Sequence, residues 1–221
     1  MITPFRVEEL FEINMEATAK VEDGVIIIDN FYKNYEEIHE YLTNIHITPW
    51  KRKSDDSRNW IDYYDSRFTI QNGFSHEKWW NQLGFIHKLI SKVYDDNRIM
   101  DVVNTDLTFN IFQNIKKDIS NRYQHYPHID TAYNVVIYLD KIASGGTVFY
   151  DMKEPDNMEE FNLLFDTNTT KIRKIVEAKS NRCIIFNGQQ VHGGYIEDHN
   201  AYTDNNWRIN QVMFYEEAKQ S

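Results

Sequence analysis

Apolar residues recur with two different periods along this chain, and the change between them falls near Thr105. Before it, residues 34–45 and 75–96 carry apolar side chains three and four positions apart, which predicts two amphipathic helices. The run 24–32 begins with a glycine and continues with apolar residues, which is typical of a buried strand. The polar and aromatic stretch 50–72 follows neither period, so we expect a loop there with a short strand at most.

After Thr105 the chain consists of short β-rich segments, which are separated by turn residues and show no helical period. These segments are 105–115, 125–132, 134–140, 146–151, 171–179, 181–187, 191–198 and 206–217. Eight short strands in about a hundred residues predict a jelly roll, in which two sheets close over one core. The expected fold class is therefore mainly β with flanking helices (α+β).

We expect residues 1–221 to form a single domain, because no internal repeat or linker divides the chain. Residues 105–216 are expected to form the β core, and residues 1–104 the helix and strand support that packs outside it. Residues 152–170 interrupt the β-rich segments, and we expect an insertion or a lid there.

The net charge and the cysteine content limit which binding partners and which cellular compartment are expected for this chain. The chain has 34 acidic and 24 basic residues, and its formal net charge of -10 repels phosphate backbones, so a nucleic-acid partner is not expected. The single cysteine, Cys183, excludes an intramolecular disulfide and lies in an apolar run, where a buried thiol is the expected role. Without a signal-peptide pattern or an apolar run of membrane-spanning length, the chain is expected to be cytoplasmic with no membrane partner.

A histidine and an aspartate stand two positions apart in "YPHID", at His128 and Asp130. Chance produces such triplets often, so the motif alone is weak. On an extended segment, side chains at i and i+2 point to the same face and can converge on one metal ion, whereas a helix would separate them by about 200°. Pro127 disfavours a helix through the residue before it, which supports the extended conformation.

A third metal ligand is offered by "CIIFNGQQVHGGY". An apolar strand ends there at Asn187 and Gly188, and His192 opens the next predicted strand. Gly193 and Gly194 follow and leave space beside the imidazole. Two histidines and one carboxylate form a facial triad, which is typical of non-haem Fe(II) oxygenases.

The last predicted strand, "NNWRINQVMFYEE", carries an arginine, Arg208, on the face that alternation assigns also to Asn210, Val212 and Phe214. If this face points inward, a buried guanidinium needs a partner, and its planar fork suits a carboxylate. A plainer alternative is an exposed arginine that pairs with Glu197 or Asp198.

Together these motifs resemble the Fe(II)/2-oxoglutarate-dependent dioxygenase superfamily, and within it the prolyl-4-hydroxylase-like branch, over about residues 105–216. The motifs that carry the resemblance are "YPHID", "IYLD", "SGGTVFYD", "CIIFNGQQVHGGY" and "WRINQVMF". The resemblance implies a double-stranded β-helix, a jelly roll of the cupin type. It further implies that His128, Asp130 and His192 hold Fe(II) at the catalytic centre. Arg208 would bind the distal carboxylate of the cosubstrate 2-oxoglutarate, and Tyr138 would hydrogen-bond the same group.

Two features depart from the family pattern. The 16 residues from His192 to Arg208 exceed the usual spacing, and His199 lies nearer to the arginine. We prefer His192 as the distal ligand because it directly follows the strand and turn, whereas His199 lies in a polar stretch that reads as a loop. Asn210 stands where many members carry a hydroxyl residue, which alters the expected detail of cosubstrate binding.

The resemblance implies an enzyme that uses O2 to hydroxylate an amino-acid or peptidyl substrate and releases succinate and CO2. Two alternatives remain open. One is an oxygenase that acts on another small metabolite or a nucleobase; the other is a non-catalytic jelly-roll module that binds without turnover. Each site residue taken singly also has an ordinary structural explanation, since a strand histidine or a turn aspartate needs no metal.

Overall fold

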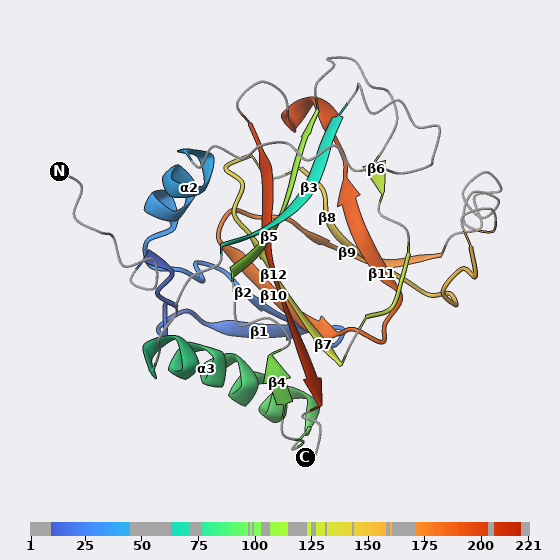
Figure 1. Ribbon diagram of the computed structural model, residues 1–221. Coiled ribbons are helices and arrows are strands. Elements are labelled where there is room, and N and C mark those ends of the chain that lie inside the picture. Colours follow the sequence, from blue (N-terminus) through green and yellow to red (C-terminus); the bar gives the residue numbers. More distant parts are fainter. Residues whose placement is uncertain are drawn as a thin grey trace.

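Two antiparallel sheets pack face to face in the computed structural model (Figure 1). The structure describes residues 10–44, 63–70, 77–96, 98, 100–102, 107–114, 123–124, 127–130, 132–142, 144–157, 160, 171–202 and 206–217. Apolar side chains of both sheets meet between them, among them Ile27 and Phe186 of one sheet and Phe149 and Val176 of the other. This arrangement confirms the predicted fold class, mainly β with a jelly-roll core.

The larger sheet contains eight of the described strands. Its order is β1 (Ala19–Glu22), β2 (Val25–Ile28), β10 (Arg182–Asn187), β7 (Tyr133–Tyr138), β12 (Arg208–Glu217), β5 (Leu107–Asn114) and β3 (Tyr63–Ile70), and β4 (Met100–Val102) also pairs with β12. β7 and β10 lie at its centre and are almost wholly buried, as expected for apolar strands covered on both faces.

The smaller sheet has the order β6 (Tyr123–Gln124), β11 (His192–Ile196), β8 (Gly146–Tyr150) and β9 (Ile172–Glu177). The chain crosses between the sheets four times as it runs from β7 to β12, and only the consecutive strands β8 and β9 of this run stay in one sheet, where they pair with each other. Gly145, just before β8, and Gly146, its first residue, have positive φ angles, and a Cβ on either would lie 2.0 Å from a backbone oxygen. Glycine is therefore required where this strand enters the small sheet.

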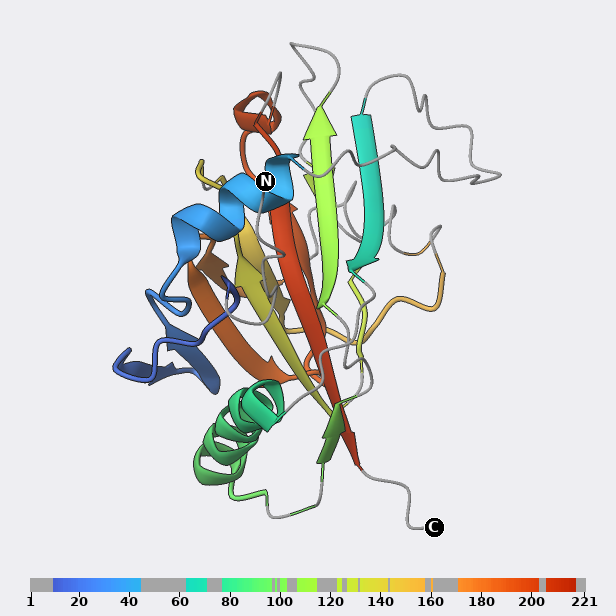
Figure 2. The same ribbon diagram turned by 60° about the vertical axis from the view of Figure 1, so that its left-hand side comes forward.

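The two described α-helices lie on the same side of the larger sheet, away from the smaller one (Figures 1 and 2). They are α2 (Tyr35–Asn44) and α3 (Glu77–Tyr94). Their buried residues are Ile38, Leu42, Leu83, Ile86 and Ile90, as the helical spacing predicts, and they pack against side chains of β7, β10 and β12. Buried Cys183 belongs to the same core, which confirms the predicted structural role of the thiol. Among the described residues, no helix has the length and apolar character needed to cross a membrane.

Alternate residues of β12 face opposite sides, as its sequence predicts. Ile209, Met213 and Tyr215 pack in the core beneath the helices. Residues of the other face line a cavity between the sheets; they are Arg208, Asn210, Val212 and Phe214. The alternation of residues along β12 therefore correctly predicts which side chains face the core and which face the cavity.

The N-terminal part contributes more strands than the sequence predicts. The stretch 50–72, expected to hold a short strand at most, contains the eight-residue strand β3, which pairs with β5 along its whole length. β2 pairs with β10, so the larger sheet continues across the division expected near residue 105. That the whole chain is one domain stays a prediction, and most of the expected lid, 152–170, lies outside the described residues.

Candidate functional site

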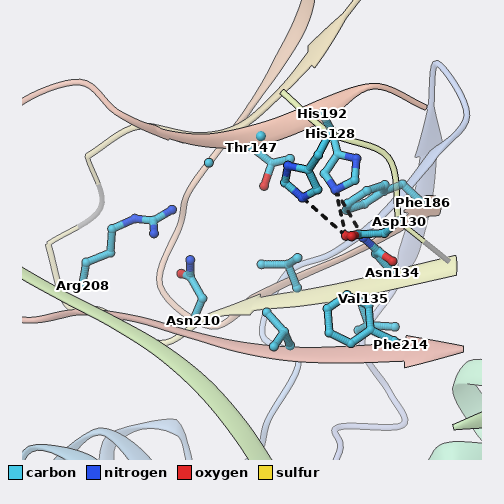
Figure 3. A pocket seen from close by; sticks show the side chains of 14 residues that line it. His128, Asp130, Asn134, Val135, Thr147, Phe186, His192, Arg208, Asn210 and Phe214 are labelled. Carbon is cyan, nitrogen blue, oxygen red and sulfur yellow. Dashed lines mark hydrogen bonds and ion pairs between the residues drawn. The ribbon is translucent and has the colours of Figure 1, made fainter. Parts of the chain in front are cut away.

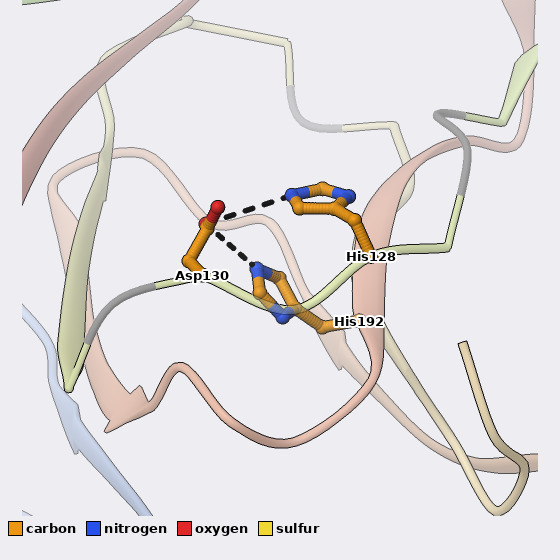
Figure 4. Close-up of side chains that lie close together, drawn as sticks. All are labelled: His128, Asp130 and His192. Carbon is orange, nitrogen blue, oxygen red and sulfur yellow. Dashed lines mark ion pairs between the residues drawn. The ribbon is translucent and has the colours of Figure 1, made fainter. Parts of the chain in front are cut away.

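Three side chains with metal-binding atoms meet at one end of the cavity, and they are the three that the sequence predicts (Figure 4). The ligand atoms of His128, Asp130 and His192 all lie within 4.8 Å of one another. Oδ2 of Asp130 is 3.5 Å from Nε2 of His128 and 3.3 Å from Nε2 of His192. Two imidazoles and one carboxylate suit a divalent transition-metal ion.

Backbone hydrogen bonds hold these ligands in register. His128 and His192 form an isolated antiparallel bridge in which each N–H donates to the other's carbonyl at 3.0 Å. The N–H of Asp130 donates to the carbonyl of Gly188 at 2.9 Å, in the turn between β10 and β11. In the same turn, Nε2 of Gln189 donates to the carbonyl of Asp130 at 2.6 Å. The predicted extended segment at 128–130 is thus pinned to the turn and strand that carry the third ligand.

The orientation of His192 leaves its Nε2 available as a ligand. Its Nδ1 lies 2.8 Å from the carbonyl oxygen of Gln190, and a carbonyl can only accept, so Nδ1 carries the hydrogen. In the neutral ring, Nε2 then presents a lone pair toward Oδ2 of Asp130. Two acceptors that face each other at 3.3 Å need a proton or a cation between them, so the donor set fits a bound metal ion.

Asn134 on β7 adds a hydrogen-bond donor that the sequence analysis did not single out. Its Nδ2 lies 2.5 Å from Oδ2 of Asp130 and 3.2 Å from Nε2 of His192. Burial alone would raise the pKa of Asp130, but the two neighbouring imidazoles and the hydrogen bond from Asn134 lower the pKa overall. The carboxylate is therefore held ionised, the form that a metal ligand requires. Strand alternation could have indicated Asn134, since it lies on the same face of β7 as Val136.

Arg208 lines the opposite end of the cavity, whose volume is about 180 Å³ (Figure 3). Its residue exposure is only 4%, so the alternative of a surface arginine paired with Glu197 or Asp198 is wrong. With its amide oxygen toward the guanidinium, Asn210 accepts from both terminal nitrogens, at 2.9 and 3.1 Å. Nε of Arg208 has no hydrogen-bond partner among the described residues. A buried cation with an unused donor fits an anionic ligand such as a carboxylate.

Tyr138 lies behind the cavity wall. It is fully buried, and its hydroxyl is 2.7 Å from Oγ1 of Thr147, which itself lines the cavity. Burial raises the pKa of Tyr138 to about 12, so the hydroxyl stays protonated and can donate to Thr147. No sequence motif predicted Thr147 as a site residue, although its place on the short strand β8 after two glycines gave a signal. A contact of Tyr138 with a cosubstrate remains a prediction.

The extra residues between His192 and Arg208 include a short 3-10 helix, η1 (His199–Tyr202). The side chain of His199 lies outside the described part of the structure, so the alternative assignment of the distal ligand stays open to experiment. Among the described residues, the cluster that can hold a metal contains His192.

No protein-family model matches the sequence, and no curated protein matches it significantly. Solved structures share its fold at low identity. AviO1 from Streptomyces viridochromogenes Tue57 is 15% identical with a TM-score of 0.51, and the match covers 100% of this chain and 99% of that one. HygX from Streptomyces hygroscopicus, with nickel, 2-oxoglutarate and hygromycin B bound, is 13% identical with a TM-score of 0.53, over 90% of this chain and 84% of that one. HygX has also been solved with iron bound; that structure is 14% identical with a TM-score of 0.50 over the same shares of the two chains. The chain therefore shares its fold with proteins that hold iron and 2-oxoglutarate, and it has a His-Asp-His cluster that can bind a metal.

Proposed function

We propose that this protein is a non-haem Fe(II)- and 2-oxoglutarate-dependent oxygenase. The observation that carries the proposal is one cavity with two chemically distinct ends. His128, Asp130 and His192 gather at one end, and the buried, incompletely paired Arg208 lies at the other. A ligand that has a metal-chelating group and a distal carboxylate suits both ends, and 2-oxoglutarate has this chemistry.

Each part of the cavity has a role in this proposal. His128, Asp130 and His192 hold Fe(II), and Arg208, oriented by Asn210, binds the distal carboxylate of 2-oxoglutarate. Iron and 2-oxoglutarate supply the oxidising chemistry, in which O2 is consumed and succinate and CO2 are released. The chain's own residues fix the ligands, anchor the cosubstrate and limit access of water through an apolar wall. That wall consists of Val136, Phe186, Val212 and Phe214.

For the substrate, we propose hydroxylation of an amino acid or a peptidyl side chain, as the resemblance to the prolyl-4-hydroxylase-like branch implies. A second candidate is another small metabolite, since HygX, which shares the fold, has been solved with hygromycin B in addition to 2-oxoglutarate. The formal net charge of -10 speaks against a nucleic-acid substrate. We place the reaction in the cytoplasm.

The test is succinate release from 2-oxoglutarate by protein loaded with Fe(II) in the presence of O2. We expect slow release without substrate and faster release with one member of a panel of amino acids, peptides and small metabolites. Asp130→Ala should abolish release because it removes the only carboxylate of the cluster, while Asp151→Ala, at an exposed position, should retain it. Undiminished release by Asp130→Ala would contradict the metal assignment. Binding of iron and 2-oxoglutarate without any release would instead indicate a non-catalytic module.

A further inference from the structure

A second buried charged residue, Asp140, lies two residues beyond β7, near enough to Arg208 for the charge of the guanidinium to act on it. Its exposure is 1%. Oδ2 accepts a hydrogen bond from the hydroxyl of Tyr202 at 2.8 Å, and Oδ1 has no partner among the described residues. The backbone carbonyl of Asp140 accepts from the hydroxyls of Tyr35 and Ser180, at 3.0 and 2.8 Å. The backbone of Asp140 is therefore fixed, while half of its carboxylate is unsatisfied.

Tyr202 comes from the extra stretch between His192 and Arg208. It is fully buried, and its oxygen accepts a hydrogen bond from the N–H of Ser144 at 2.9 Å. This contact orients the phenol so that its single hydrogen points to the charged acceptor on Asp140, at a shorter distance than the 3.2 Å to the carbonyl of Ser144. The long connection between His192 and Arg208 thus places the hydroxyl of Tyr202 against the buried carboxylate of Asp140.

The charged and titratable groups around Asp140 come from four elements. Arg208 of β12 is the cation that acts on it, while Tyr138 of β7, Tyr202 of η1 and Tyr35 of α2 are neutral phenols near neutral pH. Burial raises the pKa of Asp140 to about 6, and the charge of Arg208 and the hydrogen bond from Tyr202 prevent a larger rise. Asp140 is therefore mostly ionised at pH 7 and balances the charge of Arg208.

Resting on the proposed function, we propose that Asp140, oriented by Tyr202, is the buried counter-charge of Arg208, and that 2-oxoglutarate replaces it in this role so that binding takes up one proton. When the distal carboxylate of 2-oxoglutarate pairs with Arg208, two carboxylates share one guanidinium in a buried site. Like charges in such a site cannot both stay ionised without a large cost. A proton from solvent therefore binds Oδ1 of Asp140, the oxygen that has no partner. Asp140 and Tyr202 are positioning residues for Arg208.

The sign of the pH dependence follows from this exchange. Asp140 titrates near pH 6 in the free protein and at a higher pH in the complex, so affinity for 2-oxoglutarate rises as pH falls toward 6 and levels off below it. Uptake of one proton gives at most about a tenfold change in Kd per pH unit.

The test measures binding of 2-oxoglutarate to the nickel-loaded protein by calorimetry, at several values between pH 5.5 and 8, in buffers of different ionisation enthalpy. Asp140→Asn keeps an acceptor for Tyr202 and cannot titrate, so we expect it to bind 2-oxoglutarate with a flatter pH profile and no proton uptake. A wild-type protein that binds without proton uptake would overturn this inference and leave the proposed function intact. Absence of binding at every pH would overturn both.

A second variant separates positioning from structural support. Tyr202→Phe removes the hydroxyl that stabilises the ionised form, so the midpoint of the pH profile should move to higher pH. Tyr94→Phe is the matched control, because its hydroxyl donates to the backbone carbonyls of Gly24 and Ile185. A purely structural role would lower Tm in both variants without moving the midpoint. An unchanged midpoint in Tyr202→Phe would remove Tyr202 from the proposal.

Discussion

The two ends of the cavity are built on different principles. At the metal end, backbone hydrogen bonds fix the segment that carries each ligand, as the reciprocal bridge between His128 and His192 shows. At the arginine end, burial and charge dominate, and polar atoms of Arg208 and Asp140 lack hydrogen-bond partners among the described residues. A preorganised end needs only an ion, whereas an unsatisfied end gains stability from a ligand that completes its hydrogen bonds. Variants at the two ends should therefore differ in what they lose.

The largest effect is expected at the metal end, from His192→Ala. Loss of a direct ligand should weaken binding of Ni(II) or Fe(II) by more than about 100-fold, since even the groups that support ligands typically contribute 10–100-fold. Titration calorimetry on the metal-free protein measures this. His87→Ala, a half-buried histidine of α3 outside the cluster, and His199→Ala should bind metal like the wild type. Retained binding by His192→Ala together with loss in His199→Ala would reverse the assignment of the distal ligand.

A smaller and more selective effect is expected from Arg208→Met. Loss of charge-assisted hydrogen bonds worth about 1.5–3 kcal/mol should weaken binding of 2-oxoglutarate by roughly 10- to 100-fold and leave metal affinity unchanged. Lys141→Met removes an exposed cation and serves as the control for charge. Equal losses of metal and 2-oxoglutarate binding would show that the ends are not independent, and the comparison would fail.

The smallest effect is expected from Thr147→Val, which keeps the shape of the side chain and removes the partner of the Tyr138 hydroxyl. We expect a loss of about 1 kcal/mol in the free energy of unfolding and a few-fold weaker binding of 2-oxoglutarate. Thr43→Val on α2, where the hydroxyl bonds backbone carbonyls of its own helix, is the matched control. Denaturant unfolding and calorimetry give the two quantities. A change in metal affinity instead would place Thr147 at the wrong end of the cavity.

Periodicity predicted the elements whose faces differ in polarity. β12 is the clearest example, because its alternation separated the core side from the side that carries Arg208. The polar strand β3 was underestimated, since its stability depends on pairing with β5, and no local pattern encodes a partner that lies 37 to 51 residues away.

Within the site, the three metal-binding residues that sequence motifs predicted lie close together. The residues that support them belong to no motif and were not predicted. Asn134 supports Asp130 through a side-chain contact that only the packed strands create. Asp140 and Tyr202 are hydrogen-bonded although 62 residues separate them in the sequence. Tyr202 lies in the connection between His192 and Arg208, which is longer than the family pattern leads one to expect. The hydrogen bond from Tyr138 to the cosubstrate stays a prediction; the hydroxyl of Tyr138 contacts Thr147, which lines the cavity. Such contacts depend on three-dimensional packing, so no residue spacing in the sequence predicts them.

The reciprocal backbone bridge between His128 and His192 has a consequence for how the protein would respond to loss of iron in a cell. Because main-chain hydrogen bonds hold the two histidines together, their spacing does not depend on an ion. Loss of iron would then leave the scaffold folded, and reloading would require only side-chain rotations. The fraction of active protein would then change with the concentration of available iron. Metal-free protein would stay folded and could regain activity by binding iron, without new synthesis.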